Sequence, residues 1–124
     1  MIGPTILRRW ASKIRTEDRA AYVEYVRSTG GDDYSSTPGN LGFQMLLRDV
    51  PDGTTEIETL SWWASVEAII AFAGEDHKKA RYYTEDDRFL LTKPEFVTHF
   101  EVVVDVRQVP CVATAFRGGA LKPG

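Results

Sequence analysis

Strand-like and helix-like segments follow one another along this chain in one particular order. Alternating or β-branched patterns typical of strands cover residues 5–15, 43–49, 55–62 and 96–106, and amphipathic helix patterns cover residues 17–29 and about 65–74. The order strand, helix, strand, strand, helix, strand predicts the ferredoxin-like βαββαβ fold. The predicted fold class is therefore α+β, with a four-stranded antiparallel sheet that carries both helices on one face.

The ends of these segments carry recognisable start and stop signals. Thr16 stands before two acidic residues and is predicted to cap the first helix, and Ser65 is predicted to cap the second. Gly74 marks the end of the second helix, and Pro51-Asp52-Gly53 has the chemistry of a hairpin turn. Four apolar residues at helical spacing are predicted to form the inner face of the second helix: Val66, Ile69, Ile70 and Ala73.

The last predicted strand carries apolar side chains on both of its faces. One face holds Phe96, Phe100, Val102 and Val104, and the other holds Val97, His99, Glu101, Val103 and Asp105. An antiparallel sheet with one face in water should place mostly polar residues on that face. We therefore predict that a second copy covers the sheet face away from the helices, which makes the protein a two-fold homodimer.

Composition excludes several classes of function. Fifteen Lys and Arg against 18 Asp and Glu give a net charge of −3, so the chain is unsuited to gripping nucleic acid or an anionic membrane surface. No apolar run approaches the roughly 20 residues of a membrane span, and no secretion signal is visible, so a cytoplasmic location is expected. One cysteine, Cys111, and two histidines, His77 and His99, are too few and too far apart to predict a disulfide framework or a metal site.

The chain divides into two parts. Residues 1–106 hold all the predicted helices and strands and form one domain, whereas residues 107–124 contain prolines and glycines with little periodicity. We expect this C-terminal tail either to hang free or to pack on the partner subunit, since Val109, Val112 and Phe116 give it apolar side chains to bury.

Several short motifs occur along residues 5–106 in an order known from one family. They are RRW at 8–10, Tyr34 with PGNLG at 38–42, LSWWAS at 60–65, AIIAFAGED at 68–76, ARYYTED at 80–86 and HFEV at 99–102. With them the chain resembles the antibiotic biosynthesis monooxygenase-like family, in particular its small stand-alone members with no assigned reaction. The resemblance implies a dimeric α+β barrel with a pocket between sheet and helices. It also implies oxygenation of an aromatic compound without metal or flavin.

The same family has a haem-degrading branch, which is marked by an Asn on the first strand, a Trp in the second helix and a His farther along. At the corresponding positions this sequence has Arg8 and Arg9, then Phe72, then Tyr82. The resemblance therefore implies a reaction that needs no cofactor, and haem degradation is the lesser alternative.

His99 and Arg8 are the candidate catalytic residues. A buried neutral histidine such as His99 is suited to act as a general base near pH 7. Arg8 lies on the strand predicted to pair with the last strand, where its guanidinium would favour neutral imidazole and hold a substrate enolate or carboxylate. The structural alternatives are a hydrogen-bonded histidine in a packed sheet and an ion pair of Arg8 with Glu101 or Glu58.

Five further residues are candidates for substrate binding. Trp10, Tyr22, Tyr25 and Trp63 would line a pocket for an aromatic ligand, and the resemblance places Asn40 in a loop near the pocket mouth. Ordinary core packing is the alternative for the four aromatic residues.

Two functional hypotheses follow from these candidates. In the first, the protein is a cofactor-independent monooxygenase: His99 removes a proton from a phenol or activated carbon acid, and the resulting anion reacts directly with dioxygen. In the second, the protein binds a small ligand or a partner without catalysis.

Overall fold

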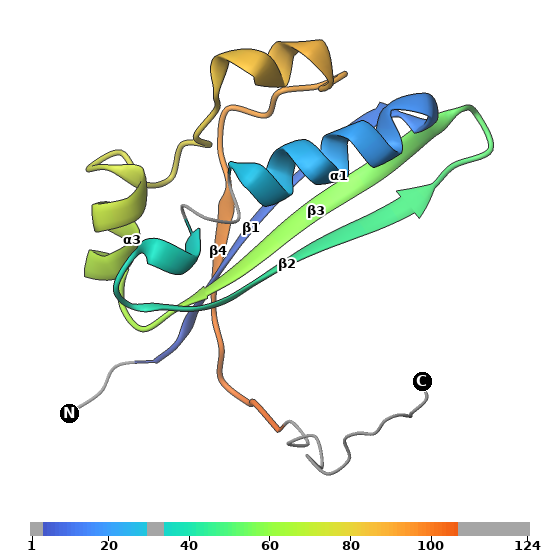
Figure 1. Cartoon of the computed structure of the whole chain (residues 1–124). Helices are drawn as coiled ribbons and strands as arrows, with labels where there is room; N and C mark the ends of the chain where they lie inside the picture. Colours follow the sequence, from blue (N-terminus) through green and yellow to red (C-terminus); the bar gives the residue numbers. More distant parts are fainter. Residues whose placement is uncertain (1–3, 30–33, 107–124) are drawn as a thin grey trace, which may run out of the picture.

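The ferredoxin-like α+β fold predicted from the sequence is confirmed. The structure, a computed structural model, describes residues 4–29 and 34–106. These residues form one antiparallel sheet in the order β2-β3-β1-β4. The strands are β1 (Ile6–Arg15), β2 (Asn40–Asp49), β3 (Thr54–Trp63) and β4 (Thr98–Glu101), and the helices are α1 (Arg19–Ser28) and α3 (Val66–Ala73). Both helices lie against the same face of the sheet (Figure 1).

Alternation along the strands decides which side chains face the helices. In β3 every second residue, from Thr55 to Trp63, is buried, and the residues between them point to the opposite face. The main core joins Ile14 of β1 and Ile57 of β3 to Tyr22 of α1 and to Phe89. Burying each of these large apolar side chains contributes roughly 1.5–3 kcal/mol to folding, so the core fixes α1 over the sheet.

The second helix confirms its predicted ends and corrects its predicted inner face. The Ser65 hydroxyl accepts a hydrogen bond from the Ala68 amide at 3.1 Å, and Gly74 ends α3 with a φ of 95°. Ile69 is buried, but Val66 is exposed. Successive residues of a helix are rotated by about 100°. With Ile69 and Phe72 directed towards the sheet, Val66 lies at the edge of that helix face and is exposed to solvent.

The start of the first helix also differs from prediction. Residues 16–18 form a separate 3-10 turn, η1 (Thr16–Asp18), and the N-cap of α1 is Asp18, which makes no capping hydrogen bond with its side chain. The Thr16 hydroxyl instead hydrogen bonds the Thr55 hydroxyl at 2.9 Å. It therefore fastens the end of β1 to the start of β3 and does not cap a helix.

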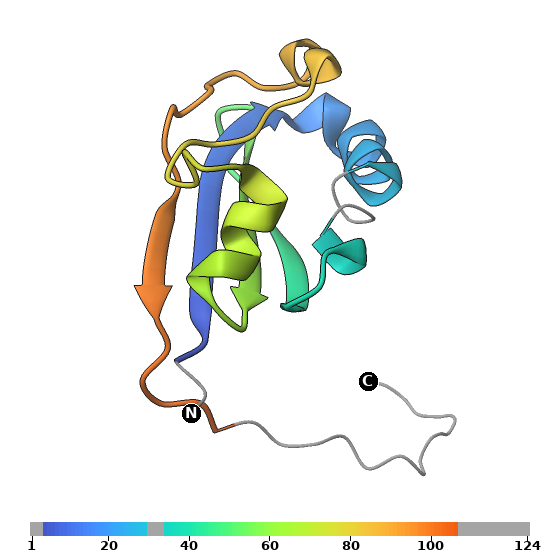
Figure 2. The same ribbon diagram turned by 90° about the vertical axis from the view of Figure 1, so that its left-hand side faces the viewer.

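The last strand is shorter than predicted, because β1 lies beside it only over residues 98–101. Residues 95–97 pair with residues 78–80 of the covering segment, and β1 begins only at Ile6, so residues after Val102 pass beyond it. Figure 2 shows β4 at the edge of the sheet, beside β1. The predicted antiparallel pairing of the first and last strands is thus confirmed over four residues of each strand.

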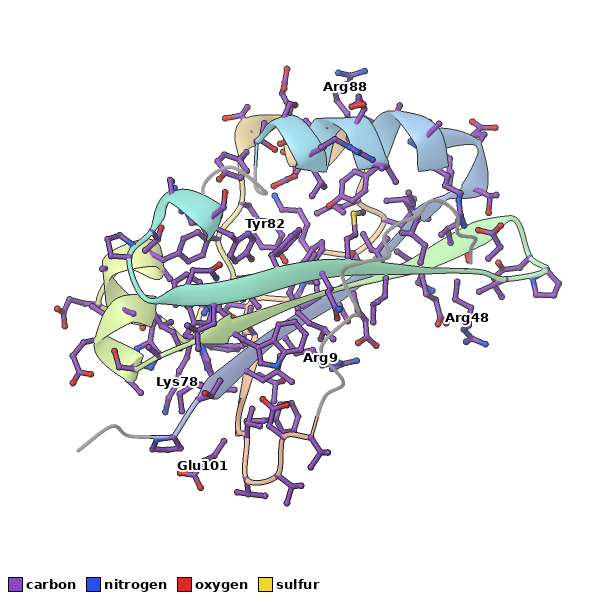
Figure 3. All side chains as sticks on the ribbon, turned by 60° about the horizontal axis from the view of Figure 1, so that its bottom comes forward. Arg9, Arg48, Lys78, Tyr82, Arg88 and Glu101 are labelled. Carbon is purple, nitrogen blue, oxygen red and sulfur yellow. The ribbon has the colours of Figure 1, made fainter. Side chains whose placement is uncertain are left out.

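The sheet face away from the helices carries a row of large apolar side chains. Leu7 of β1 is paired in register with Trp62 of β3 on one side and with Phe100 of β4 on the other. Phe100 is about half exposed, as is Leu46 of β2. Figure 3 shows Arg9 and Arg48 projecting from this same side, away from α1. We refer to this side as the outer face.

Some predictions fall outside the described residues. The Gly30-Gly31 pair, a residue type that predicts the end of the first helix after residue 29, lies outside them, as does the whole C-terminal tail from 107 to 124 with Cys111. The tail and its packing on a partner therefore stay predictions. None of the helices in the described part is long and apolar enough to cross a membrane.

Candidate functional site

A small cavity lies between the inner face of the sheet and the segments that cover it. Its volume is about 70 Å³. β1 contributes Arg8 and Trp10, α1 contributes Tyr22 and Tyr25, and other segments contribute Tyr34, Phe43, Phe72, Arg81, Tyr82 and Asp86. The walls are therefore mainly aromatic, with charged groups from a few positions. Figure 3 shows Tyr82 between the sheet and the covering elements.

Arg8 brings a buried positive charge to this cavity. Its side chain is only 3% exposed, and its guanidinium donates hydrogen bonds to the carbonyl oxygens of His77 and Lys79. Burial lowers its pKa from the usual value. Among the described residues no carboxylate forms an ion pair with Arg8, although a buried charge without a counter-ion is costly. The cavity therefore presents an unneutralised cation.

His99 lies directly beside Arg8, as predicted. The two residues are opposite each other in the β1·β4 pairing, and Arg8 Nη1 lies 3.2 Å from His99 Nε2. Burial, followed by the charge of Arg8, lowers the pKa of His99 to about 4, so the imidazole is neutral at pH 7. Because guanidinium can only donate, Nε2 is the acceptor and the proton sits on Nδ1. His99 is not part of the cavity lining.

The ion pair considered for Arg8 is made by its neighbour. Arg9 points to the outer face and binds Glu58 through two hydrogen bonds, of 3.0 and 2.8 Å. Glu58 lies on the outer face as well, since it is paired with Ala11, so the inward Arg8 does not pair with it. Within the described chain Arg8 does not pair with Glu101 either. The ion-pair alternative for Arg8 is wrong.

Three aromatic rings form a stack in the cavity wall. Tyr34 lies between Phe43 and Phe72, with ring centroids 4.5 Å apart on each side, and the Arg81 guanidinium lies 4.9 Å from the Phe72 ring centroid. Burial raises the pKa of Tyr34, while the charge of Arg8 and hydrogen bonds with Thr59 and Arg8 oppose this rise. The stack thus holds a phenol ring with its hydroxyl at Arg8.

A second group of polar side chains gathers around Asp86. This carboxylate is 6% exposed and accepts the Tyr83 backbone amide at 2.6 Å. Burial and then the charge of Asp86 raise the pKa values of Tyr22 and Tyr25. The buried Tyr25 hydroxyl lies against the Asp86 carboxylate, which raises the pKa of Tyr25 by this contact as well, but it forms no hydrogen bond of good geometry in the described structure. An unsatisfied hydroxyl and a buried carboxylate therefore meet at this part of the cavity.

Three of the five predicted binding residues line the cavity, and two do not. Trp10, Tyr22 and Tyr25 belong to its wall. Trp63 is fully buried, and its indole N–H donates to the Ser61 hydroxyl at 2.8 Å. The Asn40 side chain donates to the carbonyl oxygens of Gly42 and Trp62, so it secures the irregular start of β2.

Four residues of the cavity wall are not among the predicted site residues: Tyr34, Phe43, Phe72 and Asp86. They come from four separate segments, and only the fold brings them together. In the sequence, Tyr34 and Phe72 belong to motifs that resemble the family, but neither is predicted to bind a ligand. The sequence did hold one signal for Asp86. It stands in a short segment with two tyrosines and few aliphatic residues, so the segment has to pack its aromatic rings against the rest of the fold and carries the acid there with it.

The size of the cavity limits what can enter without rearrangement. An apolar cavity of about 150 Å³ holds a benzene molecule, and this cavity has about half that volume. An aromatic ligand can therefore enter only if a side chain of the wall moves. No group of three or more His, Cys, Asp or Glu side chains suited to a metal occurs in the described residues.

The fold is shared with solved structures, although the sequence is too far from known families to match them. Neither a protein-family model nor a curated protein matches the sequence. Among solved structures, a candidate antibiotic biosynthesis monooxygenase from Bacillus cereus has a TM-score of 0.57 at 17% identity, covering 86% of this chain and 100% of its own. One from Nitrosomonas europaea has a TM-score of 0.58 at 17% identity, covering 83% and 94%. The chain has their fold. The resemblance drawn from the motifs is confirmed at this level.

A haem-degrading protein shares this antibiotic biosynthesis monooxygenase-like fold. It comes from Mycobacterium tuberculosis, and its structure contains two haems in its active site. The TM-score is 0.56 at 23% identity, and the alignment covers 84% of this chain and all of the other. At such identities the likeness concerns the fold, and the function has to be argued from the cavity itself.

Proposed function

We propose that this chain is an antibiotic biosynthesis monooxygenase-like protein that binds an aromatic small molecule with an acidic oxygen. The observation that carries the proposal is Arg8, a buried cation without a carboxylate partner in the described chain, at the wall of an aromatic cavity. Aromatic walls favour a flat ring system, and an unneutralised guanidinium favours a phenolate, enolate or carboxylate. The ligand's anion would supply the counter-charge that Arg8 lacks.

Tyr34 supports the choice of a phenolic ligand. The protein's own phenol ring lies between Phe43 and Phe72 and reaches Arg8 with its hydroxyl. Since the cavity is too small for a second ring, we expect the ligand to displace Tyr34 and to adopt the same stacking and the same contact with Arg8.

The reaction proposed for the bound anion needs only dioxygen. A ring CH₂ that is conjugated with a carbonyl through an aromatic ring, as in anthrone, loses a proton and the carbanion adds dioxygen. The peroxide anion takes the proton back, and the hydroperoxide loses water to give a carbonyl. The net change, CH₂ and O₂ to C=O and H₂O, is balanced without another reductant. Arg8 would turn from His99 to the ligand and stabilise the anion, and His99 would accept the proton at Nε2, the nitrogen that Arg8 then leaves free.

Ligand binding without turnover is the second candidate, and the position of His99 favours it. Its Nε2 is engaged by Arg8, and the side chain lies outside the cavity lining. If His99 does not reach the ligand, the same cavity binds an anionic aromatic compound without abstracting its proton.

Haem is not proposed as a ligand, because the residues present do not fit it. A haem iron needs an axial ligand such as a neutral histidine. Neither His77 nor His99 lines the cavity, and His99 Nε2 already accepts from Arg8.

The test uses 1-naphthol as the binding probe and anthrone as the oxidisable substrate. We expect 1-naphthol to bind with a fluorescence change, and anthrone to cause oxygen uptake that exceeds the rate in buffer. With a His99 pKa of about 4, a rate that depends on neutral His99 should be constant above pH 5 and fall as the pH drops through 4. His99→Gln should then lose turnover and keep naphthol binding. Absence of naphthol binding would refute the proposed function, and binding with no oxygen uptake would leave only the ligand-binding candidate.

We also propose that the outer face is covered by a second copy of this chain. Leu7, Trp62 and Phe100 form an apolar row there that water would otherwise contact. Light scattering should give twice the 13.9 kDa monomer mass at micromolar concentration. Phe100→Lys should shift the protein towards monomer with little loss of monomer stability, because Phe100 is already half exposed. A wild-type monomer would contradict the proposal.

A further inference from the structure

Two charged side chains are buried in the described part of the chain, and both line the same cavity. Arg8 is 3% exposed and Asp86 is 6% exposed. Other buried polar residues, such as Thr55 and Ser61, are uncharged. In the described chain the two charges are not paired with each other or with any other ionised side chain. Burial of two opposite charges without ion pairs is costly. Because both charges line the same cavity, we expect them to bind the same ligand.

The two charges belong to different parts of the cavity wall. Arg8 projects from β1 among His99, Tyr34 and Phe72, whereas Asp86 belongs to the 3-10 turn η2 (Thr84–Arg88) and faces Tyr22 and Tyr25. Trp10 lies two residues after Arg8 on the same face of β1, which is a distance of roughly 7 Å along a strand. Its indole N–H donates to the Tyr82 hydroxyl at 3.0 Å, and Tyr82 itself lies close enough to Asp86 for the carboxylate to raise its pKa. The wall from Arg8 through Trp10 and Tyr82 to Asp86 therefore runs from positive to negative.

Asp86 retains the capacity to accept further hydrogen bonds. An ionised carboxylate has about four acceptor positions, and the only well-formed hydrogen bond given to this one in the described structure comes from the Tyr83 amide. Beside it lies the buried Tyr25 hydroxyl, whose contact with the Asp86 carboxylate raises the pKa of Tyr25 but does not have the geometry of a good hydrogen bond. This end of the cavity therefore offers a charged acceptor and a hydroxyl, and a ligand group that donates hydrogen bonds would satisfy both.

We infer that the ligand is a bifunctional aromatic compound, with an acidic oxygen at Arg8 and a hydrogen-bond donor, an amine or a second hydroxyl, at Asp86. The inference rests on the proposed function and adds a specificity determinant to it. Asp86 selects the donor-bearing compounds among aromatic anions, because a compound without the donor leaves the buried carboxylate unsatisfied.

The experiment compares ligands that differ only in the second group. The probes are 1-naphthol, the amino-1-naphthols and the dihydroxynaphthalenes. We expect at least one donor-bearing isomer to bind the wild-type protein about tenfold or more tightly than 1-naphthol, as expected for a hydrogen bond to a charged group. Preference for the amino or the hydroxyl series tells which donor the site takes.

Asp86→Asn is the test variant, and Asp87→Asn is its matched control. Asn retains an oxygen that can accept the Tyr83 amide, so the turn should fold, which circular dichroism will check. The neighbouring Asp87 is exposed and pairs with Lys93 at 2.7 Å. Asp86→Asn should remove the tenfold preference, measured as the ratio of the affinities for the donor-bearing isomer and for 1-naphthol, and Asp87→Asn should leave that ratio unchanged.

The outcomes separate this inference from the proposed function. If 1-naphthol itself fails to bind the wild-type protein, the proposed function and the inference both fail. If 1-naphthol binds and no donor-bearing isomer binds more tightly, or if Asp86→Asn weakens all ligands equally, the inference alone is refuted.

Discussion

Arg8→Met is expected to weaken the binding of ionised aromatic ligands by roughly 30-fold or more. Removal of one member of a buried, hydrogen-bonded charge pair costs about 2–5 kcal/mol of binding free energy, and each 1.4 kcal/mol is about tenfold in Kd. The loss should be confined to the ionised ligand, because the methionine side chain still fills the wall. Naphthalene, which has no oxygen, should bind the variant at least as well as the wild type.

The ionisation of bound 1-naphthol gives a second measurement of the same effect. A nearby guanidinium favours the anion, so the bound ligand should ionise at lower pH than free naphthol in the wild type and not in Arg8→Met. Its absorption spectrum reports this directly. An unchanged spectrum in the wild type would show that Arg8 does not contact the ligand oxygen.

Arg9→Met is the matched control for this prediction. Arg9 is the next residue on the same strand, has the same charge, and points to the outer face, where it pairs with Glu58. An exposed ion pair of this kind contributes about 0–1 kcal/mol to stability, and its loss should leave naphthol binding unchanged. Equal effects of the two variants would mean that net charge, and not a site at Arg8, governs binding.

The fold could be predicted because its elements repeat simple periods. The alternation in β3 places Ile57 and Trp63 inside and Glu58 outside, and the same period separates Arg8 from Arg9. The contact of Arg8 with His99 followed from strand order alone, since the fold pairs β1 with β4 antiparallel. These inferences need only local pattern and a known topology.

The site was predicted less completely, because its members depend on irregular segments. Tyr34 reaches Arg8 from the chain between α1 and β2, and Asp86 reaches the cavity from η2. No period links such positions to the sheet. The turn before β2 shows the difficulty: Gly39 has a φ of 90°, and a Cβ there would lie 2.5 Å from the Ala68 Cβ. The path of this segment is set by a close approach to α3 that sequence pattern does not reveal.

The misplacement of Trp63 follows from the same limit and yields a prediction for stability. Sequence alone could not distinguish a tryptophan that lines a cavity from one that lies behind its wall. Trp63 is fully buried, and its ring centroid lies 5.3 Å from that of Phe72 and 6.2 Å from that of Tyr34. Its role in this structure is to support the two rings that form the cavity wall.

Trp63→Ala is therefore expected to lower the free energy of unfolding by about 3–5 kcal/mol, the usual cost of removing a buried aromatic side chain. This is a large part of the roughly 5–15 kcal/mol that stabilises a small domain, so urea unfolding should show a clear loss.

Trp62→Ala is the control. Trp62 is the preceding residue but lies on the outer face beside Leu7, so its loss should appear mainly as a lower mass in light scattering. The decisive comparison is stability at several protein concentrations. The Trp63→Ala loss should persist at every concentration, since it arises within one subunit, whereas the Trp62→Ala loss relative to wild type should be largest at high concentration and shrink on dilution, when the wild-type subunits separate as well. Equal losses that do not depend on concentration would contradict the separation of the two faces.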